Sequence, residues 1–162
     1  MNFRFIATSL SALAISSTFT FLPIVTPQAQ AQMIMNFSAP FVSNSGIVGA
    51  AADTHFITLA VTGFSLESAT ISLPKDMGRS ITAKALDRDG REIPSTIALT
   101  PGAVTINFAQ PIKPDNYVTI RLSGIDMSRM GGRVLYRVSA KLQELGEEIP
   151  IGSAMVRLKD QG

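Results

Sequence analysis

The chain has one histidine and no cysteine, so any chemistry that needs an imidazole depends on His55. A Ser-His-Asp triad uses an imidazole to carry a proton, but Asp53 and Thr54 form no nucleophile motif beside it, and no Gly-x-Ser-x-Gly sequence occurs. A zinc site needs three or four N, O or S ligands, which one histidine without cysteine does not supply. We therefore interpret His55 as a polar residue at a strand edge, and predict a protein that is not an enzyme and holds no cofactor.

Met33, Met35 and His55 form a candidate metal site, because thioether and imidazole groups are suitable ligands for Cu(I). Methionine is also a common residue of apolar cores, and MIMNF has the alternation of a strand. We favour the structural interpretation of these residues. A periplasmic carrier of copper or of another small ligand stays open as an alternative function.

The segment LDRDGREI resembles the start of a calcium loop, with acidic residues at Asp87 and Asp89 before Gly90. The third acidic ligand and the bidentate glutamate of such a loop are missing, and Arg88 and Arg91 would repel a cation. An Asp-Gly pair between two alternating runs is typical of a hairpin, since glycine accepts the positive φ of a tight turn. The sequence therefore predicts a hairpin with Gly90 in its turn.

Three basic residues, Arg133, Arg137 and Lys141, share one face of an expected strand. Such a ridge is a possible surface contact for an anionic polysaccharide or a membrane surface. The alternative is a solvated strand face, or charges that protect an edge from aggregation. Gly131 and Gly132 predict a turn into this strand, because no helix follows them to form a phosphate site.

Apolar residues alternate in short runs along the chain, separated by turn residues roughly every ten to fifteen positions. Helical periodicity is hard to find anywhere. The expected strands are at 35–42, 55–62, 68–74, 81–87, 93–99, 103–109, 117–125, 133–142 and 151–158. This pattern predicts an all-β, immunoglobulin-like sandwich of two sheets with seven to nine short antiparallel strands.

The joint INFAQPIKPDNYVTIRL contains Pro111 and Pro114 between two of these runs, and Tyr117 at the start of the second run. Prolines cannot donate to a strand ladder, so we expect them to end the first strand. In immunoglobulin-like sandwiches, a tyrosine at such a corner donates a hydrogen bond to upstream backbone. The alternative is an ordinary tyrosine at the start of a strand.

The first 31 residues have the pattern of a signal peptide: one basic residue, an apolar stretch, and a small-x-small site at Ala29-Gln-Ala31. An uncleaved anchor is the alternative, although prolines and polar residues interrupt the stretch. We expect residues 32–53 to form an N-terminal strand and linker, and residues 54–162 to form the sandwich. The protein is then periplasmic or extracellular, with no membrane span after cleavage.

Without Arg4 of the signal peptide, 13 basic and 12 acidic residues remain, a balance that does not favour nucleic-acid binding. The absence of cysteine excludes a disulfide framework, so stability must come from the apolar core.

The C-terminal half resembles a family of exported cyanobacterial proteins that is known only as a domain of unknown function. The resemblance is carried by a Pro-x-x-Pro segment before a strand, a Gly-Gly segment before a tyrosine, and an Ile-Pro-x-Gly segment. The matching residues are Phe108, Pro111, Pro114, Val118, Ile120, Gly131, Gly132, Tyr136, Val138, Ala140, Pro150, Gly152, Arg157 and Leu158. TGFSLESA replaces the family's acidic segment, and SAMVR replaces its last glycine pair. The resemblance implies an exported β-sandwich and carries no site to transfer.

The function that these patterns favour is a non-catalytic binding or structural module of the cell envelope, with an envelope protein or polysaccharide as its partner. An assembly factor or subunit of surface appendages is an alternative, because two-sheet domains can exchange strands with partners. MIMNFSAPFV would be the exchanged strand. Pairing of this segment inside its own domain would remove the basis of that alternative.

Overall fold

The computed structural model describes residues 39–75, 77, 80–126 and 132–157. These residues form nine β-strands and no helix, so none of them belongs to a helix that could cross a membrane. The strands are β1 (Phe41–Val48), β2 (Thr54–Val61), β3 (Leu66–Ser72), β4 (Thr82–Leu86), β5 (Ser95–Thr100), β6 (Ala103–Ile112), β7 (Asn116–Ser123), β8 (Arg133–Leu142) and β9 (Glu148–Arg157).

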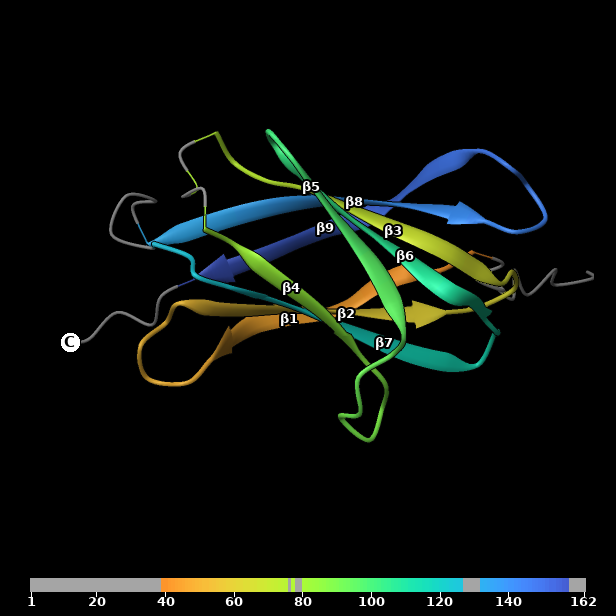
Figure 1. Cartoon of the computed structure of the whole chain (residues 1–162), viewed down its shortest axis with the longest axis horizontal. Coiled ribbons are helices and arrows are strands. Elements are labelled where there is room, and N and C mark those ends of the chain that lie inside the picture. The colour runs from red at the N-terminus through yellow and green to blue at the C-terminus, as the bar shows by residue number, and fades with distance from the viewer. Residues whose placement is uncertain (1–38, 76, 78–79, 127–131, 158–162) are drawn as a thin grey trace, which may run out of the picture. The chain divides into compact units, whose positions relative to one another are not determined.

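The strands pair in two antiparallel sheets, with the orders β1-β2-β7-β4 and β5-β6-β3-β8-β9 (Figure 1). Immunoglobulin sandwiches have the order A-B-E-D in one sheet and C-F-G in the other, where further strands can extend the sheet next to strand C. In this comparison β2 takes the place of B, β3 of C and β8 of F. The connectivity differs because the chain forms β4 before β5 and β6. The expected immunoglobulin-like fold class is confirmed.

Alternating residues of both sheets face each other and form the core. Strand β8 shows the pattern most simply, because every second side chain is buried and the side chains between them face outward. Its buried residues are Val134, Tyr136, Val138, Ala140 and Leu142. The main contributions from the facing sheet are Ile57, Leu59, Val61, Val118, Ile120 and Leu122. All eleven lie on the faces that a period of two assigns to one side of each strand.

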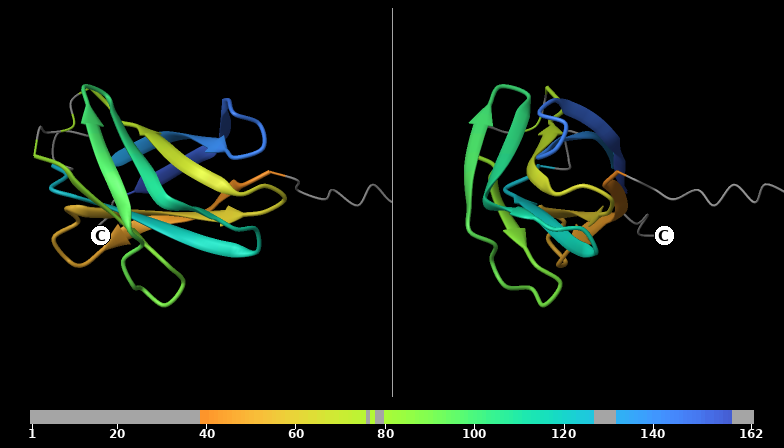
Figure 2. Two further views of the ribbon diagram at one scale, coloured as in Figure 1. Left: turned by 45° about the vertical axis from the view of Figure 1, so that its right-hand side comes forward. Right: turned by 90° about the vertical axis from the view of Figure 1, so that its right-hand side faces the viewer.

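The two sheets meet along one side of the sandwich, where β1 lies beside β9 (Figure 2). The Ser45 hydroxyl donates to the Met155 carbonyl at 3.1 Å. A methyl group placed on Gly152 would lie 3.2 Å from the side chain of Val42, so the glycine allows a close approach. On the other side, the edge strands are β4 and β5.

The N-terminal strand begins later than the sequence indicated. We expected a strand at 35–42 and a linker up to residue 53, but β1 spans Phe41–Val48 and pairs with β2 along most of its length. The expected boundary between residues 53 and 54 is therefore wrong, because β1 is part of the sandwich. Residues 35–38 lie outside the described residues. The other expected strands agree with the observed ones within three residues at each end.

Candidate functional site

His55 lies inside the sandwich and is fully buried, so its interpretation as a strand-edge residue was wrong. The residue is on β2, on the same face as Ile57 and Leu59. Its Nδ1 atom lies 2.6 Å from the hydroxyl oxygen of Tyr136 on β8, and the two rings meet edge to face at an angle of 77°. The hydrogen bond therefore joins the two sheets through the core.

Burial disfavours the charged forms of both partners. It lowers the pKa of His55, and the backbone of Ala52 opposes this effect only in part. Burial also raises the pKa of the Tyr136 phenol. The Nε2 atom of His55 has no hydrogen-bond partner among the described residues. The imidazole is thus held neutral and out of reach of a substrate, which is unsuitable for general base catalysis in this conformation.

The candidate copper ligands are not brought together in the part of the chain that the structure describes. Met33 and Met35 lie outside the described residues, and His55 is in the core. The methionine near this histidine is Met77, whose sulfur lies 3.9 Å from the Tyr136 hydroxyl. No group of three His, Asp or Glu side chains that could hold a metal ion occurs within the described ranges. The copper hypothesis thus stays a prediction.

The Asp-Gly segment forms a turn that uses its own carboxylate. Asp87 accepts hydrogen bonds from the backbone nitrogens of Asp89 at 2.9 Å and Arg91 at 2.8 Å. The Arg91 backbone hydrogen bond is the main reason why the pKa of Asp87 is lowered. Gly90 has a φ of 80°. The expected hairpin is reduced to a single bridge between Leu86 and Glu92, since β4 and β5 then diverge into different sheets.

The proline joint contains a large bulge in β6. Leu66 of β3 pairs with Ile112, whereas Ser68 pairs with Asn107, so four residues of β6 (108–111) lie opposite one residue of β3. Pro111 is thus inside the strand, which continues to Ile112, and our expectation that it ends the strand was wrong. Residues of the bulge are not paired with β3, so the proline, which has no backbone N–H, is not required to donate a hydrogen bond there. Pro114 lies in the connection to β7.

Tyr117 does not form the expected tyrosine corner. Its side chain is 44% exposed, and its hydroxyl has no hydrogen-bond partner among the described residues. The guanidinium of Arg88 lies 5.9 Å from the ring centroid. Tyr117 lies on the outward face of β7, because successive side chains of a strand alternate and its neighbour Val118 faces the core. The tyrosine that is buried and hydrogen-bonded is Tyr136.

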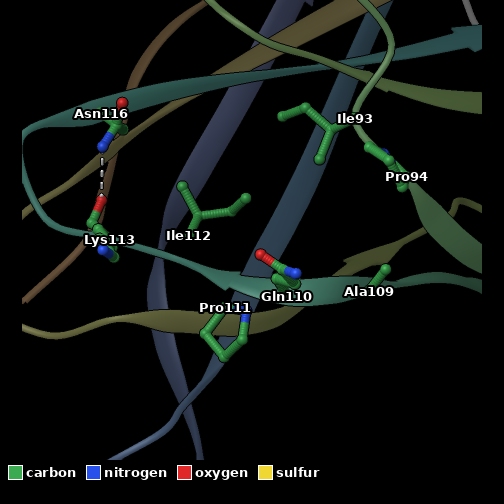
Figure 3. Close-up of a pocket in the computed structure, with 8 residues that line it drawn as sticks. All are labelled: Ile93, Pro94, Ala109, Gln110, Pro111, Ile112, Lys113 and Asn116. Atoms are coloured by element: carbon green, nitrogen blue, oxygen red, sulfur yellow. Dashed lines mark hydrogen bonds between the residues drawn. The ribbon is translucent and has the colours of Figure 1, made fainter.

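The bulge in β6 lines a surface groove of about 500 Å³ (Figure 3). Apolar side chains and prolines form much of its wall, and Gln110, Lys113 and Asn116 add polar groups. Its lining residues are Ile93, Pro94, Ala109, Gln110, Pro111, Ile112, Lys113 and Asn116. The Asn116 amide donates to the Lys113 carbonyl at 3.1 Å, which ties this end of the joint together. A second hollow of about 320 Å³ also contacts Pro111. The groove has the chemistry to hold an apolar group, with no titratable acid or base apart from Lys113.

The basic ridge lies on the outward face of β8, where Arg133, Arg137 and Lys141 are exposed. Lys141 forms an ion pair with Glu67 at 3.0 Å, so its charge is balanced. Gly132, with a φ of 76°, precedes the strand, and Gly131 lies outside the described residues. Arg157 of β9, which the sequence did not place with these basic residues, lies directly opposite Arg133. Only the register of β8 with β9 brings these two arginines together.

Comparisons with known proteins support the fold. No family model and no curated protein matches the sequence. Among solved structures, the chain is similar to BslA, a bacterial hydrophobin, with a TM-score of 0.50 and 16% identity over 76% of this chain and 96% of that chain.

Two weaker similarities extend over comparable lengths. The collagen-binding domain of a Staphylococcus aureus adhesin has a TM-score of 0.40 and 10% identity over 74% of this chain and 97% of that chain. An uncharacterized Nocardia farcinica protein with an immunoglobulin-like fold has a TM-score of 0.39 and 10% identity over 75% of this chain and 98% of that chain.

Proposed function

We propose that the protein is an exported, non-catalytic β-sandwich that acts as a binding or structural module of the cell envelope. The observation that carries this proposal is the position of His55, the only imidazole of the chain. It is fully buried and hydrogen-bonded to Tyr136, so its role is to connect the two sheets within the core. The surface, in contrast, offers a groove beside the β6 bulge and an exposed basic face on β8.

The export of the protein and its membership of the cyanobacterial family of unknown function are part of this proposal. They rest on the pattern of residues 1–31 and on the motifs in the C-terminal half. Strand exchange stays an alternative only for residues 33–38, which lie outside the described residues, since Phe41 and Val42 pair with Ala60 and Leu59 of the same domain.

A pull-down from the envelope fraction of the source cells tests the proposed function. The bait is the chain from Gln32 to Gly162, which includes all nine described strands. Mass spectrometry and glycan analysis should identify a defined protein or polysaccharide in the eluate. The eluate from a bait unfolded by heat is the control for binding to exposed apolar segments.

An activity screen provides the opposing test. The same chain is incubated with esterase and glycosidase substrates, beside the variant His55→Phe. We expect no turnover by either protein. Turnover that is lost in His55→Phe, while the fold of the variant is retained, would overturn the proposal, because it would show that the buried imidazole takes part in catalysis.

A further inference from the structure

The outward face of β8 and β9 carries three arginines around an exposed apolar pair. Arg133 lies opposite Arg157, Leu135 opposite Met155, and Arg137 opposite Ser153. The arginines are exposed, while Leu135 is 52% and Met155 49% exposed. Residues directly opposite on neighbouring strands have Cβ atoms about 4.5–5.5 Å apart. We call this set of Arg133, Leu135, Arg137, Met155 and Arg157 the arginine patch.

Among the described residues, no acidic group balances the charges of the arginine patch. Across the described ranges, none of its three guanidinium groups forms an ion pair. Like charges placed directly opposite on two strands are destabilising, which applies to Arg133 and Arg157. Arg157 donates from Nε to the sulfur of Met155 at 3.2 Å, a contact that leaves its charge uncompensated.

The other end of the same face is different. Lys141 is paired with Glu67 and lies opposite Glu148 in the β8–β9 ladder. The Ser139 hydroxyl also donates to Glu148. Acidic residues thus neutralise the end of β8 near Leu142, and positive charge is concentrated at the end near Arg133.

We infer that the arginine patch binds the surface of a membrane that contains acidic phospholipids. Arginine is suited to this contact because its planar guanidinium can donate two hydrogen bonds to one phosphate group. Leu135 and Met155 lie between the arginines, where they can enter the boundary between headgroups and acyl chains. This inference rests on the proposed function, and it names the class of surface that the module contacts.

The apolar pair favours a lipid surface over a soluble polyanion. An acidic polysaccharide that carries no apolar groups would be attracted by the arginines, and would gain little from the two exposed apolar side chains. A lipid surface gains from both kinds of residue: each basic residue contributes about 1 kcal/mol near an acidic surface. Self-association through this face is opposed by the three unbalanced charges.

Vesicle sedimentation with the chain from Gln32 to Gly162 tests the inference. We expect binding to vesicles of phosphatidylglycerol and phosphatidylcholine in equal parts, and little binding to pure phosphatidylcholine. Added salt should weaken it, since the screening length falls from about 10 Å at 0.1 M to about 3 Å at 1 M. Binding equally to both vesicles, or to neither, would overturn the inference. The pull-down could still identify a protein partner, so the proposed function would be judged separately.

Two pairs of variants locate the binding surface. Arg133→Gln with Arg157→Gln should reduce binding about 25-fold, at about fivefold per arginine. The matched control changes Arg88 and Arg121 to Gln, which removes the same charge from other surfaces. Both of these arginines are exposed, and Arg121 is on the opposite sheet. An equal loss in the control would show that only net charge matters, and would overturn the inference.

The apolar pair distinguishes lipid from other anions. Leu135→Thr with Met155→Thr keeps every charge and should reduce vesicle binding about tenfold, because less apolar surface is buried in the lipid. Thermal unfolding shows whether the fold is retained. Leu99→Thr is its control, because Leu99 is also 52% exposed but lies on β5. If the Leu135/Met155 variant binds vesicles as well as the unchanged protein, and both proteins bind soluble dextran sulfate equally, the partner is a polyanion and the lipid inference is wrong.

Discussion

The hydrogen bond between His55 and Tyr136 joins β2 to β8, and these strands belong to different sheets. In antibody domains the corresponding strands B and F are joined by a disulfide through the core. This chain has no cysteine. The corresponding strands are instead joined by a hydrogen bond of 2.6 Å between two fully buried side chains. Unlike a disulfide, this link does not depend on the redox state of the compartment, but it does depend on the protonation state of its two partners.

The substitution Tyr136→Phe should destabilise the fold by about 1–3 kcal/mol, because it leaves the buried Nδ1 of His55 without its partner. Urea unfolding of the two proteins measures the change in the free energy of unfolding. The matched control is Thr119→Val, which removes a hydroxyl contact of 3.1 Å with Thr58 on a partly buried outer face. The control should change stability less. Equal changes in the free energy of unfolding would mean that the buried hydrogen bond stabilises the fold no more than the partly buried one.

Stability should fall as the pH drops below about 6.5, the ordinary pKa of histidine. Burial lowers the pKa of His55 in the folded protein, so the unfolded chain binds its proton first and is favoured in acid. The loss continues until the pH has passed the folded-state pKa. Because His55 is the only histidine, its imidazole signals can be followed by NMR without assignment. His55→Phe should show a smaller loss of stability between pH 7 and pH 5, and equal losses would contradict this account.

At alkaline pH, the dependence of stability on pH has the opposite sign. Burial raises the pKa of Tyr136, so the phenol ionises first in the unfolded chain, and stability should decrease as the pH rises above about 10. Ultraviolet absorbance of phenolate measures the ionisation of Tyr136 directly. The variant Tyr117→Phe isolates the signal of Tyr136. Ionisation of that remaining tyrosine near pH 10 with the fold intact would show that its burial has little effect.

Gly124→Ala should be more damaging than Gly49→Ala, although both glycines have a positive φ of 84° and 80°. A methyl group on Gly124 would lie 2.5 Å from the backbone oxygen of Ser80, whereas nothing lies within 4 Å of the same position at Gly49. The backbone conformation alone costs about 1–2 kcal/mol, and Gly124→Ala adds a clash that no side-chain rotation can relieve. Thermal unfolding midpoints compare the two variants, and similar shifts would contradict the packing around Gly124.

Pro111→Ala should change the free energy of unfolding by about 1 kcal/mol or less, because the bulge places residue 111 outside the ladder with β3. Thr105→Pro is the contrasting variant: Thr105 lies in the same strand but pairs with Thr70 on one side and Ala98 on the other. A proline there removes a donor from the middle of the sheet, so it should destabilise the fold more than Pro111→Ala does. Chemical unfolding measures both, and a severe effect of Pro111→Ala would contradict the bulge.

Local alternation was enough to predict most strands. The run at 133–142 has a clear period of two, and it also assigns Tyr136 to the core. The same rule applied to residues 55–62 places His55 beside Ile57 and Leu59, so its burial could have been read from the sequence. A preference for polar residues at the surface led to the wrong interpretation.

Relationships between distant strands could not be predicted in this way. The arginine patch depends on which residue of β9 lies opposite Arg133, and that register includes a shift between Val138 and Ser139. The bulge at Pro111 depends in the same way on how β3 aligns with β6. Register is set by packing of the whole sheet, and one residue of slip would turn every side chain to the other face.

The contact between β1 and β9 sets how the domain would respond to mechanical load. Val42 lies beside Gly152 and Ser45 beside Met155, so the first and last strands run in the same direction along this side. The described chain therefore leaves the sandwich at opposite ends of the two strands. A pull applied between residues 39 and 157 acts along β1 and β9, and it loads their hydrogen bonds with β2 and β8 together, in shear. A domain stretched between two attachment points would yield by sliding whole strands at once, and not by opening one pair at a time.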